Sequence, residues 1–305
     1  SKAVTRWRQG AINIVVNAES EGFAHSFHIT HGTSVCALAL RVDDARATVE
    51  RALALRDQPF QGAIGPGELD IPAVRGLGGS LLHFVDHAHG LDRLWDVDFA
   101  PVTGDADAAD AGLTVIDHVS QSMQYEEMLS WSLFYTALLE VGKAPTQAVL
   151  DPGGVVQSQA VESADGRLRL ILNASQSRQT LASRFLHEFF GSGVQHIAFA
   201  TDDIFATVER VTAAGIALLP MPENYYDDLE VRADLTAEEL GRLRAGNILY
   251  DVQGDGAYYH VYTGSLQDGF FFEIVQRRGY AGYGAANAPI RLAAQTRQAA
   301  RPVIP

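Results

Sequence analysis

The apolar residues of this chain form many short runs in which hydrophobic and polar positions alternate, a pattern typical of β-strands. Three of these runs carry an ionisable side chain in an apolar setting: His118, His196 and Glu273. The runs are residues 113–119, 193–199 and 269–275. A buried polar group costs free energy unless a partner binds it. Two imidazoles and one carboxylate are a ligand set that leaves positions on a metal open, so the pattern predicts one metal site.

The three candidate ligands are almost evenly spaced, by 78 residues (196 − 118) and 77 residues (273 − 196). A repeat of about twice that length is also visible. Residues 43–51 read DDARATVER and residues 202–210 read DDIFATVER, at an offset of 159 (202 − 43). A fainter match joins residues 14–18 to residues 170–174, at an offset of 156 (170 − 14). Self-similarity at a fixed period indicates a structural unit that is used more than once.

We therefore predict four similar modules, each with a strand, a helix and further strands. In the second and fourth modules the helix would follow paired aspartates, whose charge suits the positive end of the helix dipole. The last three modules would span residues 34–98, 113–175 and 193–278, and only later strands of the first would be present, near residues 5–17. Because the first module lacks its opening strand and helix, we expect an N-terminally truncated piece of a longer protein.

The modules pair into two predicted domains, residues 1–101 and residues 113–305, and only the second domain contains the metal ligands. Residues 102–112 are acidic and rich in small residues, which is typical of a linker. A helix-like stretch near residues 289–300 has no counterpart in the first half, and we expect it to lie across the site as a lid. The expected fold class is α+β, with two domains of paired βαβββ modules.

Aligning the two halves of the repeat tests the metal prediction. The first half has Ala37 where the second has His196, and His83 where the second has Glu273. One half thus keeps the ligand set and the other does not. Histidines with a purely structural role would give no reason for that asymmetry.

Composition narrows the possible partners and the compartment. The chain has 305 residues and a net charge of −14, which argues against nucleic acid and against anionic membrane surfaces. Its apolar runs fall well short of the ~20 residues of a membrane span. The single cysteine, Cys36, excludes an internal disulfide and suits a reducing cytoplasm. We also expect a homo-oligomer.

Several runs are similar to marker sequences of the 4-hydroxyphenylpyruvate dioxygenase family, a member of the vicinal oxygen chelate superfamily. They are residues 69–82, 193–199, 271–277 and 282–284. The resemblance covers nearly the whole chain and implies two vicinal-oxygen-chelate domains. It further implies a non-haem Fe(II) ion held by His118, His196 and Glu273, with a small aromatic or 2-oxo-acid ligand beside it. The same ligand set also accepts Mg, Mn, Co or Zn.

The resemblance also implies a substrate pocket beside the metal. Its expected residues are Ser158, Asn173, Gln195, His260, Tyr262 and Tyr283. Only the first three match the family. His260 replaces a glutamine, Tyr262 and Tyr283 replace phenylalanines, and two further departures are Leu181 for a glutamine and Ala288 for a phenylalanine. These changes alter the polarity and shape of the pocket, so hydroxyphenylpyruvate is a doubtful substrate.

A closer resemblance is to the C-terminal half of fused bacterial 3-dehydroshikimate dehydratases, in which an upstream (β/α)₈ barrel forms protocatechuate. This predicts a metal-binding, dioxygenase-like half of such an enzyme, with the dehydration carried by a barrel outside the 305 residues. Two alternatives stay open at this point. The chain is either an active Fe(II)-dependent dioxygenase acting on an aromatic 2-oxo acid such as 4-hydroxyphenylpyruvate, or a metal-binding structural module without catalysis.

Overall fold

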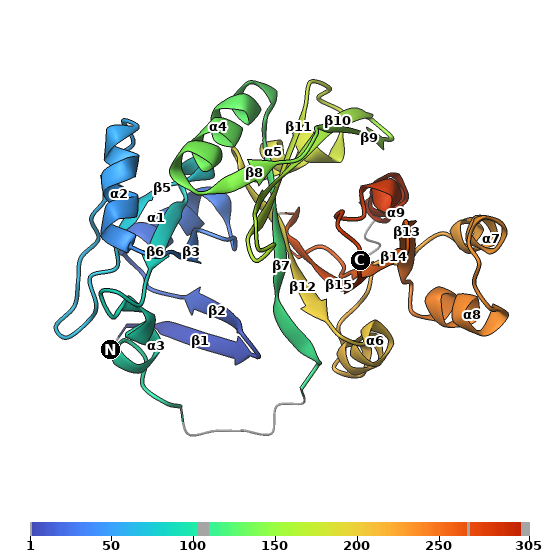
Figure 1. Ribbon diagram of the computed structural model, residues 1–305, viewed down its shortest axis with the longest axis horizontal. Helices are drawn as coiled ribbons and strands as arrows, with labels where there is room; N and C mark the ends of the chain where they lie inside the picture. Colours follow the sequence, from blue (N-terminus) through green and yellow to red (C-terminus); the bar gives the residue numbers. More distant parts are fainter. Residues whose placement is uncertain (1, 103–109, 267–268, 300–305) are drawn as a thin grey trace.

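The computed structural model describes residues 2–102, 110–266 and 269–299, and the fold is mixed α+β (Figure 1). The described strands form a two-stranded, a four-stranded and a nine-stranded sheet. Of the predicted linker, residues 103–109 lie outside the described residues. Among the described residues, no helix is both long enough and apolar enough to cross a membrane.

The first two sheets belong to the N-terminal third of the chain. Strands β1 (Val4–Gln9) and β2 (Ile12–Asn17) form an antiparallel hairpin and supply the later strands expected of the first module. The second module follows helix α1 (Gly22–His31). It consists of β3 (Ala37–Arg41), α2 (Ala45–Ala54), β4 (Pro59–Phe60), β5 (Ala73–Arg75) and β6 (Leu81–Val85), and α3 (Leu94–Val97) ends this region. The strand order β3-β6-β5-β4 places β3 parallel to β6.

The nine-stranded sheet is built from the third and fourth modules. The third module comprises β7 (Leu113–Gln124), α4 (Met128–Leu138), β8 (Val141–Lys143), β9 (Gln147–Asp151), β10 (Gly154–Ser163) and β11 (Arg169–Ser175). Helix α5 (Leu181–Glu188) joins it to the fourth, which contains β12 (Gly193–Thr201), α6 (Ile204–Ala213), α7 (Glu223–Arg232), α8 (Ala237–Ala245), β13 (Leu249–Gln253), β14 (Gly256–Tyr262) and β15 (Phe271–Arg278). Helix α9 (Ala288–Ala299) completes the described chain. The predicted limits 113–175 and 193–278 coincide with the start of the first strand and the end of the last strand of these two modules.

The topology confirms the predicted α+β fold. In each of the last three modules the first strand runs parallel to the last: β3 to β6, β7 to β11, and β12 to β15. The third and fourth modules join through the antiparallel pair β7 and β12, so their opening strands lie at the centre of the sheet. Figure 1 shows this sheet curling around an open side that α9 partly covers.

The paired aspartates begin helices, as the repeat predicts. Asp44 caps α2 by accepting a hydrogen bond from the backbone N–H of Ala47. Asp203 caps α6 in the same way, accepting from the N–H groups of Phe205 and Ala206. A side-chain oxygen at this position satisfies backbone donors that have no partner within the helix.

One apolar core extends across both halves of the chain. It contains Leu82 and Phe84 of β6 together with Leu170 and Leu172 of β11, and all four are buried. The two halves of the chain also come close together at Gly78 and Ser192. A β-carbon on Gly78 would lie 1.7 Å from the carbonyl oxygen of Ser192, so only glycine lets the two backbones come this close. The four-stranded sheet is therefore packed against the third module, which leaves the curled face of the nine-stranded sheet free for a polar site.

Candidate metal centre

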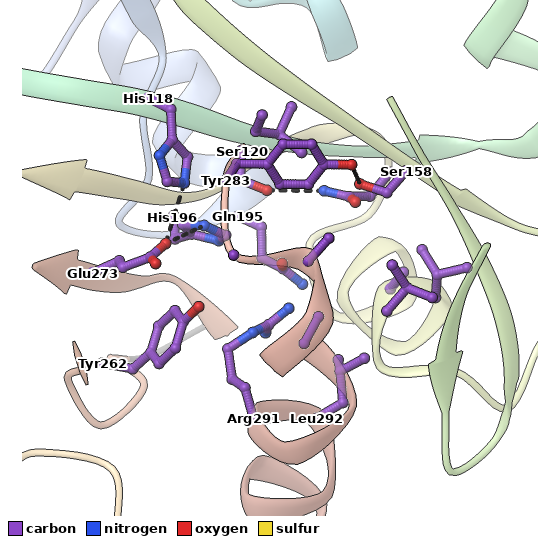
Figure 2. A pocket seen from close by; sticks show the side chains of 18 residues that line it. His118, Ser120, Ser158, Gln195, His196, Tyr262, Glu273, Tyr283, Arg291 and Leu292 are labelled. Carbon is purple, nitrogen blue, oxygen red and sulfur yellow. Dashed lines mark hydrogen bonds and ion pairs between the residues drawn. The ribbon is translucent and has the colours of Figure 1, made fainter. Parts of the chain in front are cut away.

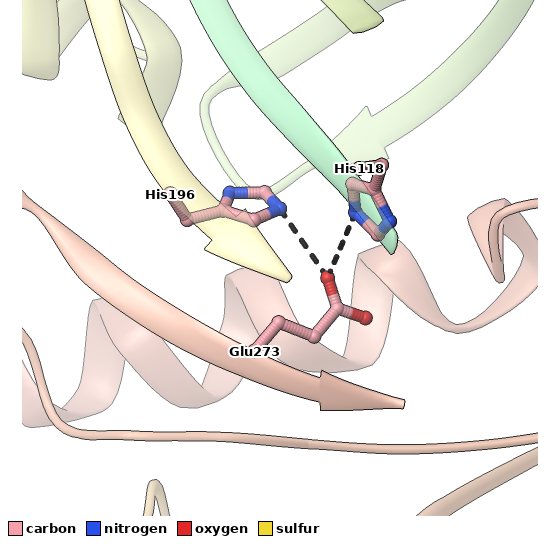
Figure 3. A group of neighbouring side chains, drawn as sticks. All are labelled: His118, His196 and Glu273. Carbon is pink, nitrogen blue, oxygen red and sulfur yellow. Dashed lines mark ion pairs between the residues drawn. The ribbon is translucent and has the colours of Figure 1, made fainter. Parts of the chain in front are cut away.

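The three predicted ligands converge on adjacent strands of the nine-stranded sheet (Figure 3). His118 lies on β7, His196 on β12 and Glu273 on β15, which are consecutive in the sheet order. The Nε2 atoms of His118 and His196 lie 3.1 and 3.3 Å from Oε2 of Glu273. All three residues are buried, with exposed fractions of 3% for His118, 6% for His196 and 1% for Glu273. Residues far apart in sequence thus present three ligand atoms within 4.8 Å of one another.

Sheet register explains this convergence. Ala198 on β12 is the cross-strand neighbour of both His118 and Glu273. Directly opposed residues point to the same face of a sheet, and so do residues two apart on one strand. His196, two residues before Ala198, therefore shares their face. Ala198 itself is fully buried, and its small side chain leaves room for the three longer ones to meet above it.

The pKa shifts of the three residues indicate that the space between them favours positive charge. Burial alone would raise the pKa of Glu273, but the charge of His118 and hydrogen bonds from His118, His196 and His260 hold it well below its usual range. Burial would lower the pKa of His118, yet the Glu273 and Asp117 carboxylates raise it to about 9. For His196 burial dominates and lowers the pKa to about 4. The buried Glu273 carboxylate thus favours positive charge between itself and the two imidazoles.

A second layer of residues orients the ligands. The His118 Nδ1 donates to Asp117 Oδ1 over 2.7 Å, which leaves Nε2 facing Glu273. Asp117 is held in turn by Arg277, whose Nε and Nη2 lie 2.5 and 2.8 Å from its carboxylate oxygens. On the other side, His260 Nδ1 donates to Glu273 Oε1 over 2.9 Å, which leaves Oε2 for the centre. Partners of this kind fix ligand orientation in metal sites.

The donor set fits a divalent metal ion. Two neutral imidazole nitrogens and one carboxylate oxygen are ligands that Fe, Mn, Co, Zn and Mg accept to different degrees. The His196 Nδ1 is buried without a hydrogen-bond partner among the described residues. The ring is therefore oriented by stacking against Phe271 and by the contact of its Nε2 with Glu273. A cation between the three ligand atoms would compensate the charge of the buried Glu273 carboxylate.

A cavity opens beside the triad, between the sheet and α9 (Figure 2). Its volume is about 50 Å³, which suits an ion and a few waters, whereas an apolar cavity that holds benzene measures about 150 Å³. A ring-sized ligand therefore needs side chains or α9 to move. The lining residues are His118, Ser120, Val149, Val156, Ser158, Ile171, Asn173, Ala182, Gln195, His196, Tyr262, Glu273, Tyr283, Gly284, Ala285, Ala288, Arg291 and Leu292.

Five of the six residues predicted for the substrate pocket line this cavity: Ser158, Asn173, Gln195, Tyr262 and Tyr283. Three of them form hydrogen bonds within the wall. The Tyr283 hydroxyl donates to Ser158 over 3.2 Å, and the Asn173 amide donates to Ser120 over 2.9 Å. The new tyrosine hydroxyl at position 283 thus finds a partner, as a buried hydroxyl should.

His260, the sixth residue predicted for the substrate pocket, is not among the residues that line this cavity. It is completely buried behind Glu273, where its Nε2 faces the Asn287 side chain at 3.2 Å and its Nδ1 also lies 3.0 Å from the Tyr262 hydroxyl. The alternation of β14 sets His260 and Tyr262 on the same face, but only Tyr262 is among the residues that line the cavity. His260 therefore acts on the carboxylate ligand and does not contact the space beside it.

The sequence prediction missed Ser120 and Arg291 in the cavity wall. Ser120 lies two residues after His118 on β7, so the alternation of that strand was the available signal. Arg291 comes from α9, which lies along the cavity and contributes Ala288, Arg291 and Leu292 to its wall. That position agrees with the expectation that the C-terminal helix lies across the site.

Comparison with known proteins adds family evidence to this geometry. Residues 1–100 match the family model described as hydroxyphenylpyruvate dioxygenase, N-terminal. Residues 115–235 match the model of the glyoxalase/bleomycin resistance protein/dioxygenase superfamily. The two matches fall on the two halves of the repeat and agree with two vicinal-oxygen-chelate domains.

Individual proteins are similar to this chain over nearly its whole length. The 3-dehydroshikimate dehydratase of Pseudomonas aeruginosa is 49% identical over 99% of this chain and 48% of its own length. A solved xylose isomerase-like TIM barrel/4-hydroxyphenylpyruvate dioxygenase fusion protein matches with a TM-score of 0.83 and 47% identity, over 98% of this chain and 47% of that one. The chain thus spans about half the length of these relatives.

A third relative is matched over most of its length. The 4-hydroxyphenylpyruvate dioxygenase of a Pseudomonas species is 34% identical over 94% of this chain and 82% of its own length. Both halves of the fold and the buried triad are consistent with that similarity. The chain therefore belongs to the 4-hydroxyphenylpyruvate dioxygenase family, within the vicinal oxygen chelate superfamily.

Proposed function

We propose that this chain is the metal-binding, dioxygenase-like half of a 3-dehydroshikimate dehydratase whose dehydration step is carried by a (β/α)₈ barrel outside the 305 residues. The support is its similarity to the P. aeruginosa dehydratase, which extends over nearly all of this chain but about half of the relative. The solved fusion protein pairs a barrel with the same type of domain. The observation that carries the metal-binding part is the convergence of His118, His196 and Glu273.

In this proposal one divalent ion would be held by His118, His196 and Glu273, whose Nε2, Nε2 and Oε2 atoms face one another. Such an ion would supply a Lewis acid with open positions for oxygen ligands. The protein orients His118 through Asp117 and Glu273 through His260. The remaining cavity wall, with Asn173, Gln195 and the tyrosines, would hold the ligand.

Two measurements test the proposal. The 305-residue chain, stripped of metal and titrated with Co²⁺, should bind one ion per chain, with absorption bands of a site containing imidazole. The same chain should not dehydrate 3-dehydroshikimate, whereas the full-length gene product should form protocatechuate from it. Dehydration by the isolated chain, or a full-length reading frame without a barrel, would refute the dehydratase part of the proposal. Absence of stoichiometric metal would refute the metal part.

A second candidate function is an Fe(II)-dependent oxygenase acting on an aromatic 2-oxo acid. It is favoured by Ser158, Asn173 and Gln195, which match the family pattern and line the cavity beside the triad. Anaerobic loading with Fe(II), followed by O₂ uptake with 4-hydroxyphenylpyruvate, tests it directly. Uptake stoichiometric with substrate would establish the oxygenase. Bound metal without uptake would leave a non-catalytic, metal-binding module within the larger enzyme.

A further inference from the structure

Arg291 is a buried cation that has no carboxylate partner within the part of the chain that the structure describes. Its exposed fraction is 9%, the same as that of Arg169, yet the two arginines differ in their surroundings. Arg169 pairs with Glu162 over 2.9 Å and lies 3.6 Å from Asp117. Arg291 forms no ion pair among the described residues. Its Nη1 donates to the neutral Gln295 side chain over 2.7 Å, and the guanidinium also lies within hydrogen-bonding reach of the neutral Tyr262 hydroxyl. A buried charge that is not paired is expensive, so this position is unusual.

The side chain of Arg291 points into the cavity. Figure 2 shows it extending from α9 on the side where Gln195 and Tyr262 lie. Its guanidinium carbon lies 5.3 Å from the centre of the Tyr262 ring and 5.6 Å from that of Phe271. These aromatic contacts fix the orientation of the planar group but do not neutralise its charge. The guanidinium is therefore held in place with donors available to the cavity.

The charges around the cavity leave an excess of positive charge once a metal is bound. Glu273 is the only acidic residue and Arg291 the only arginine or lysine among the lining residues. A divalent ion with Glu273 carries one net positive charge, and Arg291 adds a second. Behind the wall, Asp117 and Arg277 compensate each other. A ligand that neutralises the whole site carries two negative charges, one for the metal and one for Arg291.

We propose that the ligand of this cavity is a small dianion: it chelates the metal through a pair of oxygens and places a separate carboxylate on Arg291. This inference rests on the proposed metal site and specifies its ligand class. Arginine suits the task because its planar fork makes two parallel, charge-assisted hydrogen bonds to a carboxylate. Gln195, in the same wall, offers an amide donor to the same group. The chelating oxygens belong either to a 2-oxo acid, whose own carboxylate carries the second charge, or to a ring with two adjacent hydroxyls, one of which releases its proton to solvent when it binds the ion.

Paired probes test the proposal under anaerobic conditions with Co²⁺-loaded protein. One pair is 3,4-dihydroxybenzoate and catechol, and the other is 2-oxoglutarate and 2-oxopentanoate. Within a pair the chelating group is shared, and only one member carries the additional carboxylate. By calorimetric titration we expect the member with the additional carboxylate to bind roughly 10- to 100-fold more tightly than its partner, as charge-assisted hydrogen bonds allow. The pair that shows this preference identifies the chelating chemistry.

Variants assign the preference to Arg291. Arg291→Gln should abolish the difference within the pair while affinity for the member without the additional carboxylate changes little. Arg291→Lys keeps the charge but loses the fork, and should retain part of the preference. The matched control is Arg297→Gln, which removes an exposed arginine from the same helix and should change nothing. The Co²⁺ spectrum of each variant reports separately on the metal site.

Several results would overturn the inference. Equal affinities within both pairs for the native protein would do so even if the Arg291→Gln variant fails to fold. Equal losses for both members of a pair in that variant would show that Arg291 only packs α9 against the sheet. Failure of all four probes to bind the metal-loaded protein would also overturn it. Absence of the Co²⁺ spectrum before any probe is added would instead refute the proposed metal site.

Discussion

The second and fourth modules share a backbone register but differ in the side chains that the register brings together. In the fourth module the parallel pair β12 and β15 sets His196 opposite Phe271 and Ala198 opposite Glu273. In the second module the pair β3 and β6 sets Ala37 opposite Leu81 and Ala39 opposite His83. Ala37 thus occupies the place of His196, and His83 that of Glu273, as the sequence alignment predicted. The fold needs the register, whereas the metal centre needs particular residues on it.

The two modules also differ in what lies beside the first strand. Strand β12 has β7 as its second neighbour, and β7 supplies His118. Strand β3 is at the edge of its four-stranded sheet, with only β6 beside it among the described strands. The difference teaches that the site belongs to a pair of modules. One module supplies two ligands, and the third comes from its antiparallel neighbour.

Among these tests of the difference between the two modules, removal of one metal ligand should have the largest effect on metal binding. Glu273→Gln replaces the shared carboxylate and should abolish stoichiometric Co²⁺ binding, because an amide oxygen carries no charge to hold the ion between two imidazoles. The matched control is His83→Gln, at the equivalent register position of the second module. It should leave binding at one ion per chain. Equal metal binding by the two variants would show that the ion does not occupy the triad.

Loss of the residue that orients His118 should have an intermediate effect. Asp117→Asn keeps the size of the side chain but leaves the half-buried Arg277 without its carboxylate. We expect metal affinity to fall about 10- to 100-fold, as for other partners of ligating histidines. The free energy of unfolding should fall by about 1 to 3 kcal/mol, because a largely desolvated guanidinium loses its carboxylate partner.

Asp165→Asn is the control for that variant, since Asp165 is an exposed carboxylate in the turn before β11. Denaturant titrations and metal titrations of both variants separate stability from affinity. A normal affinity in Asp117→Asn would show that the packing around His118 orients its ring without help from the carboxylate.

The two aspartate caps offer a smaller test of the repeat itself. Asp44→Ala and Asp203→Ala each remove hydrogen bonds to the first turn of a helix, in α2 and α6 respectively. Each should lower the free energy of unfolding by about 1 kcal/mol. Metal affinity should stay unchanged in both variants, because neither helix supplies a ligand. A change in affinity for Asp203→Ala alone would reveal coupling between α6 and the centre.

Introduction of two ligand residues into the second module should leave the number of bound metal ions unchanged. The double variant Ala37→His with His83→Glu recreates two ligands of the fourth module at the matching positions of the second. We expect no additional bound ion in a Co²⁺ titration, because β3 has no neighbouring strand in the position of β7 among the described residues. A second stoichiometric ion would show that two ligands and the register suffice, and the requirement for a module pair would be wrong.

The sequence alone determined the local and repeated features of this protein. The alternation of the strands, the aspartate caps and the limits of the third and fourth modules all depend on nearby residues, and all were predictable. The triad was predictable as well, because an ionisable residue in an apolar strand is anomalous wherever that strand lies. Family motifs then added the predicted pocket residues, of which Ser158, Asn173 and Gln195 line the cavity beside the triad.

Only the tertiary structure decided how these parts share space. His260 and Tyr262 are two residues apart on one strand, yet the curl of the sheet puts His260 behind Glu273 and Tyr262 in the cavity wall. Arg291 becomes a cavity residue because α9 packs across the open side of the sheet. Ala198 joins the three ligands only through the register of two different strand pairings. The physical reason is that such contacts depend on long-range packing, which local patterns of polarity do not encode.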